Sequence, residues 1–265
     1  MSPKKIRTIS KKRYFVFVLL IELYQVNRKT TSINKHTTVA ITGTNDQTDL
    51  NNPIWAINWF NLKRPRLYTL YNILVFPHLK KVGGRAHFKG YIKEKLEGNS
   101  DFDRQMLLIV TYPTASAFLQ MVSNKLFMLK SILRLKSVSR FIFGFSKRIG
   151  DQPAPPEKPA RYIGKNFYMA HLFQGDQVSE DDLLLLKPLF SQYNLVNYFS
   201  GLKTATLSRI NKDGSEQIQP FFVDGLFVLE GSEKASFDML LKDPIYEAFK
   251  SKCAENNVYW VKRVI

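Results

Sequence analysis

One short segment, Ile54-Trp-Ala-Ile-Asn-Trp-Phe-Asn-Leu62, is rich in β-branched and aromatic residues and predicts a β-strand. Both faces of this strand are apolar: the two tryptophans and Ile57 alternate with Ala56 and Phe60. The later segment 105–112 is also apolar on both faces. In a sheet built from such strands, the helices of the same domain cover one face only. The other apolar face must therefore be buried against another part of the protein. We expect that part to be a second sheet.

The elements around this segment follow the order βαββαβ over residues 53–149. A helix comes after the first strand, and Pro77 with Gly83-Gly84 is expected to end it. Two strands and a helical region follow, and a last strand closes the unit. Their expected ranges are Arg85 to about Lys95, Gln105–Tyr112, Pro113 to about Ser137, and Arg140–Phe145.

A linker at 150–162 comes next, with four prolines between Asp151 and Pro159. The same order then returns over residues 163–265. A capping box at Ser179-Glu-Asp-Asp182 is expected to open the first helix of this half. The other expected elements are strands at Phe167–Phe173, Tyr198–Ile210, Ile218–Leu229 and Val258–Val261, a hairpin turn at Asn211–Gly214, and a helix capped by Ser232.

A local repeat supports a duplication. Asn124-Lys-Leu-Phe127 and Asp243-Pro-Ile-Tyr246 each lie shortly before the closing strand of their half. We therefore predict an α+β fold of two ferredoxin-like βαββαβ domains, at 53–149 and 163–265. Their uncovered sheet faces would pack together as an intramolecular pseudo-dimer.

The net charge of +17 is unevenly distributed. Lys and Arg minus Asp and Glu gives 17 − 4 = +13 for residues 53–149, and 11 − 13 = −2 for 163–265. A basic domain of this kind is compatible with nucleic acid, an anionic membrane surface or an anionic ligand. Cys253 is the only cysteine, which excludes an internal disulfide and a thiolate metal site. The four histidines show no metal-binding spacing.

Residues 1–52 are predicted to be a basic extension followed by a polar tether at 37–52. The basic stretch precedes an apolar run, Tyr14–Ile21, which is too short to span a bilayer even when extended to Val26. The segment 14–26 is thus compatible with a weak signal or anchor. The alternative is that residues 1–36 are a basic extension, and the basic N-terminus could contact a membrane peripherally. A cytoplasmic location is favoured, with a membrane-anchored or exported protein as the alternative.

Residues 56–135 resemble an uncharacterised bacterial family of the dimeric α+β barrel superfamily. Gly83-Gly-Arg85 and Tyr112-Pro113 carry most of the resemblance, and Leu133 stands where that family often has a histidine. The resemblance implies that the tandem halves form such a barrel internally. Haem-degrading relatives would need a tryptophan and a histidine on helices, whereas the three tryptophans here fall on predicted strands. No cofactor is therefore expected.

Six residues are candidate contacts for a ligand inside the barrel: Asn58, Arg85, His87, Asp103, Tyr112 and Arg134. Asn58 is either a hydrogen-bonded core amide or an amide that orients a ligand. Arg85 either caps the preceding helix or binds an anion. His87 alternates in phase with Arg85, so both could join Asp103 and Tyr112 in one cluster. Arg134 belongs either to that site or to a solvated basic helix face.

The preferred function is binding of a small hydrophobic or anionic ligand without clear catalysis. The alternative is a small cofactor-independent oxidoreductase, of a monooxygenase-like or isomerase-like kind, so enzymatic activity is left open. Nucleic acid binding is disfavoured because the third strand is aliphatic, whereas RNA-recognition domains of this order carry exposed aromatic residues there. The protein is expected to be a monomer, because the second half replaces a partner subunit.

Overall fold

The computed structural model describes residues 38–42, 51–98, 100–150, 166–175, 177–210, 216–218, 221 and 223–264. These belong to one compact unit, residues 38–265. The predicted signal or anchor at 14–26, the prolines of the linker and the Asn211–Gly214 turn lie outside the described residues.

The first half contains the predicted βαββαβ order. Its strands are β2 (Ile54–Leu62), β3 (Arg85–Glu97), β4 (Met106–Tyr112) and β5 (Val138–Arg148), and its helices are α2 (Pro65–Lys81), η2 (Ser100–Phe102), α3 (Ala115–Val122) and α4 (Lys125–Ser137). The second half repeats it with β6 (Phe167–Gln174), α5 (Glu180–Gln192), β7 (Val196–Ile210), β9 (Gly225–Gly231), α6 (Lys234–Leu241), α7 (Pro244–Ser251) and β10 (Glu255–Arg263).

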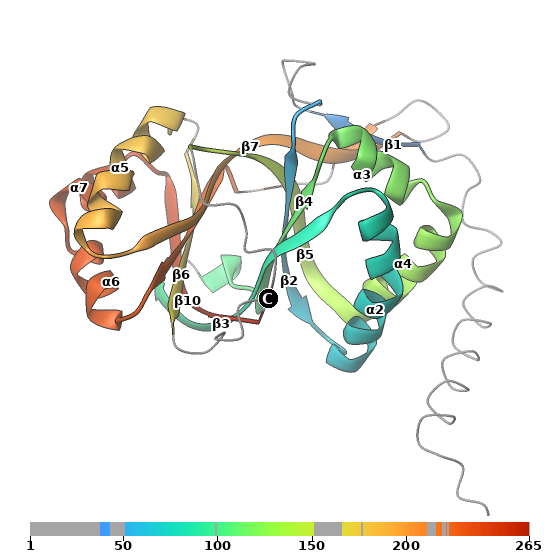
Figure 1. The fold of residues 1–265 in the computed structure, drawn as a ribbon, viewed down its shortest axis with the longest axis horizontal. Coiled ribbons are helices and arrows are strands. Elements are labelled where there is room, and N and C mark those ends of the chain that lie inside the picture. Colours follow the sequence, from blue (N-terminus) through green and yellow to red (C-terminus); the bar gives the residue numbers. More distant parts are fainter. Residues whose placement is uncertain are drawn as a thin grey trace, which may run out of the picture. The chain divides into compact units, whose positions relative to one another are not determined.

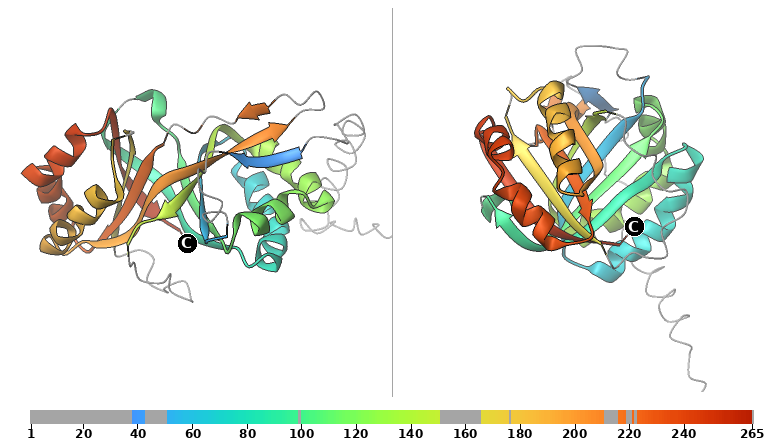
Figure 2. Two further views of the ribbon diagram at one scale, coloured as in Figure 1. Left: turned by 90° about the horizontal axis from the view of Figure 1, so that it is seen from above. Right: turned by 60° about the vertical axis from the view of Figure 1, so that its left-hand side comes forward.

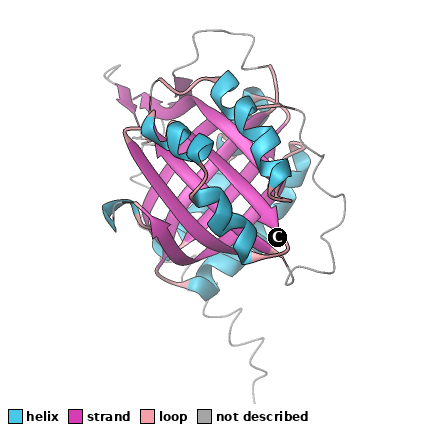
Figure 3. Cartoon of the chain, turned by 90° about the vertical axis from the view of Figure 1, so that its left-hand side faces the viewer, coloured by secondary structure: helices cyan, strands magenta, loops and turns pink. Residues whose placement is uncertain are grey.

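Eight strands close into a barrel in the order β7-β5-β2-β4-β3-β10-β6-β9, and β9 pairs back onto β7. Figures 1 and 3 show the barrel between two helical layers, α2–α4 on one side and α5–α7 on the other. Each half contributes four neighbouring strands, and the pairs β5–β7 and β3–β10 join the halves. The predicted intramolecular α+β barrel is confirmed.

The two faces of each strand fill different cores. Trp55, Ile57 and Trp59 of β2 pack inside the barrel with residues of both halves, including Phe199 and Val261. The opposite faces pack under the two helical layers as separate clusters. Strands that are apolar on both faces are thus buried on both faces, as the sequence predicted.

Several predicted boundaries are wrong. Helix α2 ends just before Gly83-Gly84, as predicted, but Pro77 does not contribute to its end. The helix continues through Pro77 to Lys81, because Pro77 lies on its exposed side, where solvent can satisfy the carbonyl that lacks a partner. Each long helical region is in fact two helices. Asn124 and Asp243 start the second of these by accepting main-chain N–H groups of Leu126 and Ile245.

The polar segment 37–52 is not simply a tether. Its residues Thr38–Thr42 form strand β1, which pairs with the end of β7 beyond the barrel, and β8 (Glu216–Ile218) pairs with β7 there too. Figure 2 shows this long extension of β7. Ser232 was predicted to cap a helix, but α6 starts at Lys234, with Glu233 in the capping position and no side-chain cap. The Ser179–Asp182 capping box is confirmed.

Candidate functional site

The first helix of each half is joined to the next strand by the same local geometry. Gly83 follows α2 with a φ of 74°, and Asn194 follows α5 with a φ of 56°. In both places the main-chain N–H of the next residue donates a hydrogen bond to the carbonyl oxygen five residues earlier. Gly84 donates to Leu79, and Leu195 donates to Phe190. This is the Schellman arrangement, which needs a residue that tolerates positive φ. The predicted C-cap at Gly83-Gly84 is therefore confirmed, and Asn194-Leu195 forms the equivalent cap in the second half.

Four residues after each of these caps comes a β-bulge. The register of β3 shifts between Ala86 and Phe88, and that of β7 between Asn197 and Phe199. His87 and Tyr198 are the extra residues, at equivalent positions of the two halves. A bulge redirects a side chain relative to regular alternation. Both rings turn into the barrel, where their centroids lie 4.9 Å apart.

An arginine from the last strand of each half joins this pair. Arg148 ends β5 and its Cζ lies 5.0 Å from the ring centroid of Trp55. Arg263 ends β10 and its Cζ lies 5.5 Å from the ring of Tyr168. In the sheet, Trp55 is paired with Ser146 and Tyr168 is paired with Val261. Arg148 and Arg263 each follow that paired residue by two positions, so the two arginines occupy equivalent places in the two halves.

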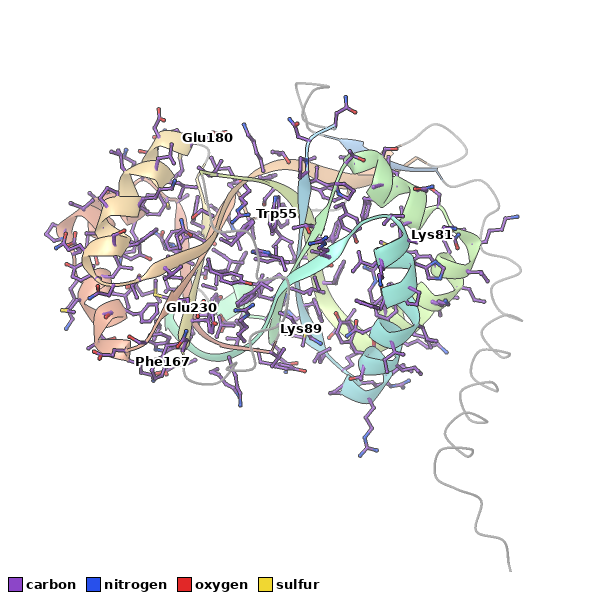
Figure 4. The ribbon with its side chains drawn as sticks, viewed as in Figure 1. Trp55, Lys81, Lys89, Phe167, Glu180 and Glu230 are labelled. Atoms are coloured by element: carbon purple, nitrogen blue, oxygen red, sulfur yellow. The ribbon has the colours of Figure 1, made fainter. Side chains whose placement is uncertain are left out.

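The duplicated positions meet at one end of the barrel. All neighbouring strands are antiparallel, so strands four places apart in the ring run in the same direction. Equivalent strand ends of the two halves therefore lie at the same end. We call this the arginine end, formed by Trp55, His87, Ser146, Arg148, Tyr168, Tyr198, Glu230 and Arg263. Figure 4 labels Trp55 and Glu230.

Arg263 is held by hydroxyl groups. Its Nη1 donates to the Tyr168 hydroxyl at 3.1 Å, and its Nη2 donates to the Tyr198 hydroxyl at 2.7 Å. The Tyr198 hydroxyl in turn donates to the main-chain oxygen of His87 at 2.9 Å. Burial raises the pKa of Tyr168 to about 12, so the phenol stays protonated at neutral pH. This part of the arginine end is a completed hydrogen-bond network.

The other part, around Trp55, contains buried polar groups without partners. His87 is 3% exposed, and within the described residues neither of its ring nitrogens makes a hydrogen bond of normal geometry, although an interaction with the main chain of Tyr198 partly offsets the lowering of its pKa. Ser146, on the inward face of β5 opposite Trp55, is 1% exposed, and its Oγ is unpartnered in the same sense. Such groups are rare in native proteins because burial without a hydrogen bond costs about 1–3 kcal/mol.

The electrostatics of this part favour an anion. Burial, and then the positive charge of Arg148, lower the pKa of His87 to about 4, so its imidazole is neutral at pH 7 and can donate one hydrogen bond. Ser146 can donate another. Arg148 and Glu230 are only partly buried, which places this end of the barrel next to solvent.

His171 offers a useful contrast inside the same protein. It is completely buried, yet its Nδ1 lies 2.7 Å from the Tyr246 hydroxyl and its Nε2 lies 2.9 Å from Asn256 Oδ1. Burial lowers its pKa to about 3. A histidine with both nitrogens satisfied in an apolar core is explained by packing, whereas His87 is not.

The six predicted site residues are not brought together. His87 lies in the arginine end. Asn58 faces the helical side, where its amide donates to the carbonyls of Ala56 and Leu108, and Tyr112 packs there against Phe118. Three others lie elsewhere: Arg85 is exposed at the start of β3, Asp103 contacts Lys95 and Tyr259, and Arg134 lies over the Phe141 ring.

Sequence reasoning missed Arg148 and Arg263. A signal was present, because Lys147-Arg148 and Lys262-Arg263 repeat the same dipeptide at the end of the last strand of each half. The predicted closing strands stopped at Phe145 and Val261, just before these pairs. The bulges that turn His87 and Tyr198 inward have no comparable sequence signal.

No protein-family model and no curated protein matches this chain. Solved structures do. An anthrone oxidase-like protein is 10% identical, with 85% of this chain and 95% of that protein covered and a TM-score of 0.47. A mutant chlorite dismutase from Candidatus Nitrospira defluvii is 11% identical, with coverages of 80% and 91% and a TM-score of 0.45. A protein of unknown function from Rhodopseudomonas palustris is 20% identical over 44% of this chain and all of its own length, with a TM-score of 0.35.

At these identities and TM-scores, no function of this chain follows from the similarity. The strand order by itself shows that the two βαββαβ halves close into an α+β barrel within one polypeptide. Among the described residues, no helix is long and apolar enough to cross a membrane. Within the same residues, no three side chains of the His, Cys, Asp and Glu types are grouped as a metal site requires.

Proposed function

We propose that this protein binds a small anionic ligand with an apolar portion at the arginine end of its barrel. The observation that carries the proposal is His87, a buried imidazole whose nitrogens make no hydrogen bond of normal geometry among the described residues. It lies 4.6 Å, centroid to centroid, from the Trp55 ring, over which the Arg148 guanidinium is also placed. An anionic group received there would gain hydrogen bonds that the protein alone does not make.

The chemistry of the surrounding side chains supports a carboxylate. The imidazole of His87 and the hydroxyl of Ser146 are neutral donors, and the guanidinium of Arg148 supplies positive charge. The rings of Trp55 and Phe199 lie 5.1 Å apart next to His87, and both are buried, so the apolar part of a ligand would be received by displacing one of them. An aromatic carboxylate combines both properties.

Binding is favoured over catalysis at this site. A general base works best when its pKa is near the working pH, whereas burial and Arg148 lower the pKa of His87 to about 4. An imidazole of this kind is a weak proton acceptor at neutral pH. The alternative, a small cofactor-independent oxidoreductase or isomerase, would need the ligand to raise this pKa.

Thermal unfolding in the presence of two probes tests the proposal. Benzoate carries an aromatic ring and a carboxylate, and benzyl alcohol is a similar neutral molecule. We expect benzoate, and not benzyl alcohol, to raise the Tm of the wild-type protein. His87→Leu and Arg148→Met should abolish the shift, while Arg85→Met, which changes an exposed arginine near His87 in sequence, should keep it.

Two results would overturn the proposal. One is the absence of any benzoate shift in the wild-type protein. The other is a shift that His87→Leu and Arg148→Met leave at its wild-type size, which would place the anion elsewhere.

A further inference from the structure

Helices α2 and α4 form a continuous outer layer on the first half of the barrel. They lie side by side, since Lys130 Nζ of α4 donates to the carbonyl oxygen of Leu74 at 3.1 Å and lies 2.8 Å from His78 Nε2. Figure 1 shows both helices on the outside of the sheet. Their outward surface is therefore a single surface.

This surface exposes large apolar side chains. Ile73 and Phe76 of α2 are 64% and 60% exposed, and Met128 and Leu135 of α4 are 50% and 63% exposed. Each pair lies on one side of its helix, because residues three or seven positions apart share a face. The inward faces of the same helices are already buried, through residues such as Tyr68 and Phe127. The exposed apolar residues therefore do not pack in the core under the helices or in the barrel interior.

The same layer carries no acidic residue. Helices α2, α3 and α4 contain no Asp or Glu, and the four acidic residues of 53–149 all fall between Glu94 and Asp103. The basic residues of α2 and α4 are Arg66, Lys80, Lys81, Lys125, Lys130, Arg134 and Lys136.

The second half provides an internal comparison. Its helices also expose apolar side chains, such as Leu185 at 69% and Met239 at 51%. Those helices contain acidic residues, namely Glu180, Asp181, Asp182, Asp238 and Glu247. Apolar exposure together with exclusively basic charge is therefore a property of the first-half layer and not of the fold.

We propose that the outward faces of α2 and α4 dock on an anionic phospholipid surface. Basic side chains are attracted to the headgroups, and large apolar side chains between them enter the boundary with the acyl chains. A polyanion such as nucleic acid would use the lysines but leave Ile73 and Phe76 without a role. The N-terminal segment 1–36 is an unsuitable occupant, because its own charge of 9 − 1 = +8 is repelled by this layer.

Vesicle co-sedimentation of the full chain tests this surface. We expect binding to vesicles of phosphatidylcholine with phosphatidylglycerol, and not to phosphatidylcholine alone. The double variant Ile73→Gln/Phe76→Gln should weaken binding at least about tenfold through the loss of apolar burial. Lys80→Gln/Lys136→Gln should weaken it by a similar factor. The matched control, Leu185→Gln/Met239→Gln on the second half, should bind as the wild type does.

A fluorescence measurement locates the docking face directly. The three native tryptophans are buried, so Phe76→Trp adds an exposed one. Anionic vesicles should shift its emission to the blue, while Met239→Trp should show no shift. Binding that depends on the lysines but not on Ile73 and Phe76 would overturn the proposal in favour of a simple polyanion contact. Wild-type binding in every variant would also overturn it, as would the absence of binding to anionic vesicles.

Discussion

The Tyr198 hydroxyl donates a 2.9 Å hydrogen bond to the main-chain oxygen of His87, its counterpart in the other half of the chain. Both residues are the extra residue of a β-bulge, and both follow a positive-φ helix cap by four residues. Duplicated backbone geometry thus brings two different side chains together near the pseudo-twofold axis. Tyr198 satisfies its hydroxyl there, whereas His87 keeps two unpartnered nitrogens among the described residues.

The His87 side chain is predicted to lower the stability of the free protein. Replacing it by leucine, which has a similar volume and no polar atom, removes a buried unsatisfied group. We expect His87→Leu to raise the free energy of unfolding by about 1 kcal/mol at pH 7. Urea denaturation measures this, and a clearly less stable variant would show that the imidazole has structural partners.

The same substitution at His171 should have the opposite effect. His171→Leu leaves the Tyr246 hydroxyl and the Asn256 side chain without the partner that each has in the core. We expect a loss of about 3 kcal/mol in the free energy of unfolding. The two histidine variants can be compared in one denaturation series, and equal effects would contradict the distinction between them.

Stability should fall as the pH is lowered from 7 to 5. Burial lowers the pKa of His87 to about 4 and that of His171 to about 3, whereas both titrate near 6.5 when unfolded. Between pH 6.5 and 4 the unfolded chain binds more protons, so acid favours unfolding. Each histidine should cost on the order of 2 kcal/mol at pH 5. His87→Leu should show about half of this combined dependence, and an unchanged slope would argue against a neutral buried His87.

The barrel interior should not tolerate a larger residue at position 144. Gly144 lies on the inward face of β5, and a Cβ there would meet the ring of Phe221. We expect Gly144→Ala to lower the free energy of unfolding by about 1–3 kcal/mol, since the ring must move within a packed core. The control is Gly175→Ala, where the nearest heavy atom lies 3.2 Å from the added Cβ. Equal Tm values for the two variants would contradict close packing between the halves.

The sequence predicted the fold well because the decisive information is local and repeated. Trp55 and Trp59 share one face of β2 while Ala56 and Phe60 share the other, and this pattern alone required two coverings. The caps at Asn124 and Asp243 were also visible as a repeat, although their role in dividing each helical region was not recognised.

The candidate site was much less predictable. Regular alternation placed His87 in phase with Arg85, but the bulge at this point separates them, so Arg85 is exposed while His87 is buried. Arg148 and Arg263 both come near the His87 and Tyr198 pair only because the strands of the two halves close into one ring. Contacts of this kind depend on register between distant strands, which a single sequence does not specify.

A crystal structure with 4-bromobenzoate shows whether an anion binds beside His87 and Arg148. We expect an anomalous bromine peak at the arginine end and a carboxylate within hydrogen-bond distance of a His87 ring nitrogen, both absent from crystals of His87→Leu. A barrel without bromine, in which the His87 nitrogens bind only ordered water, would contradict it.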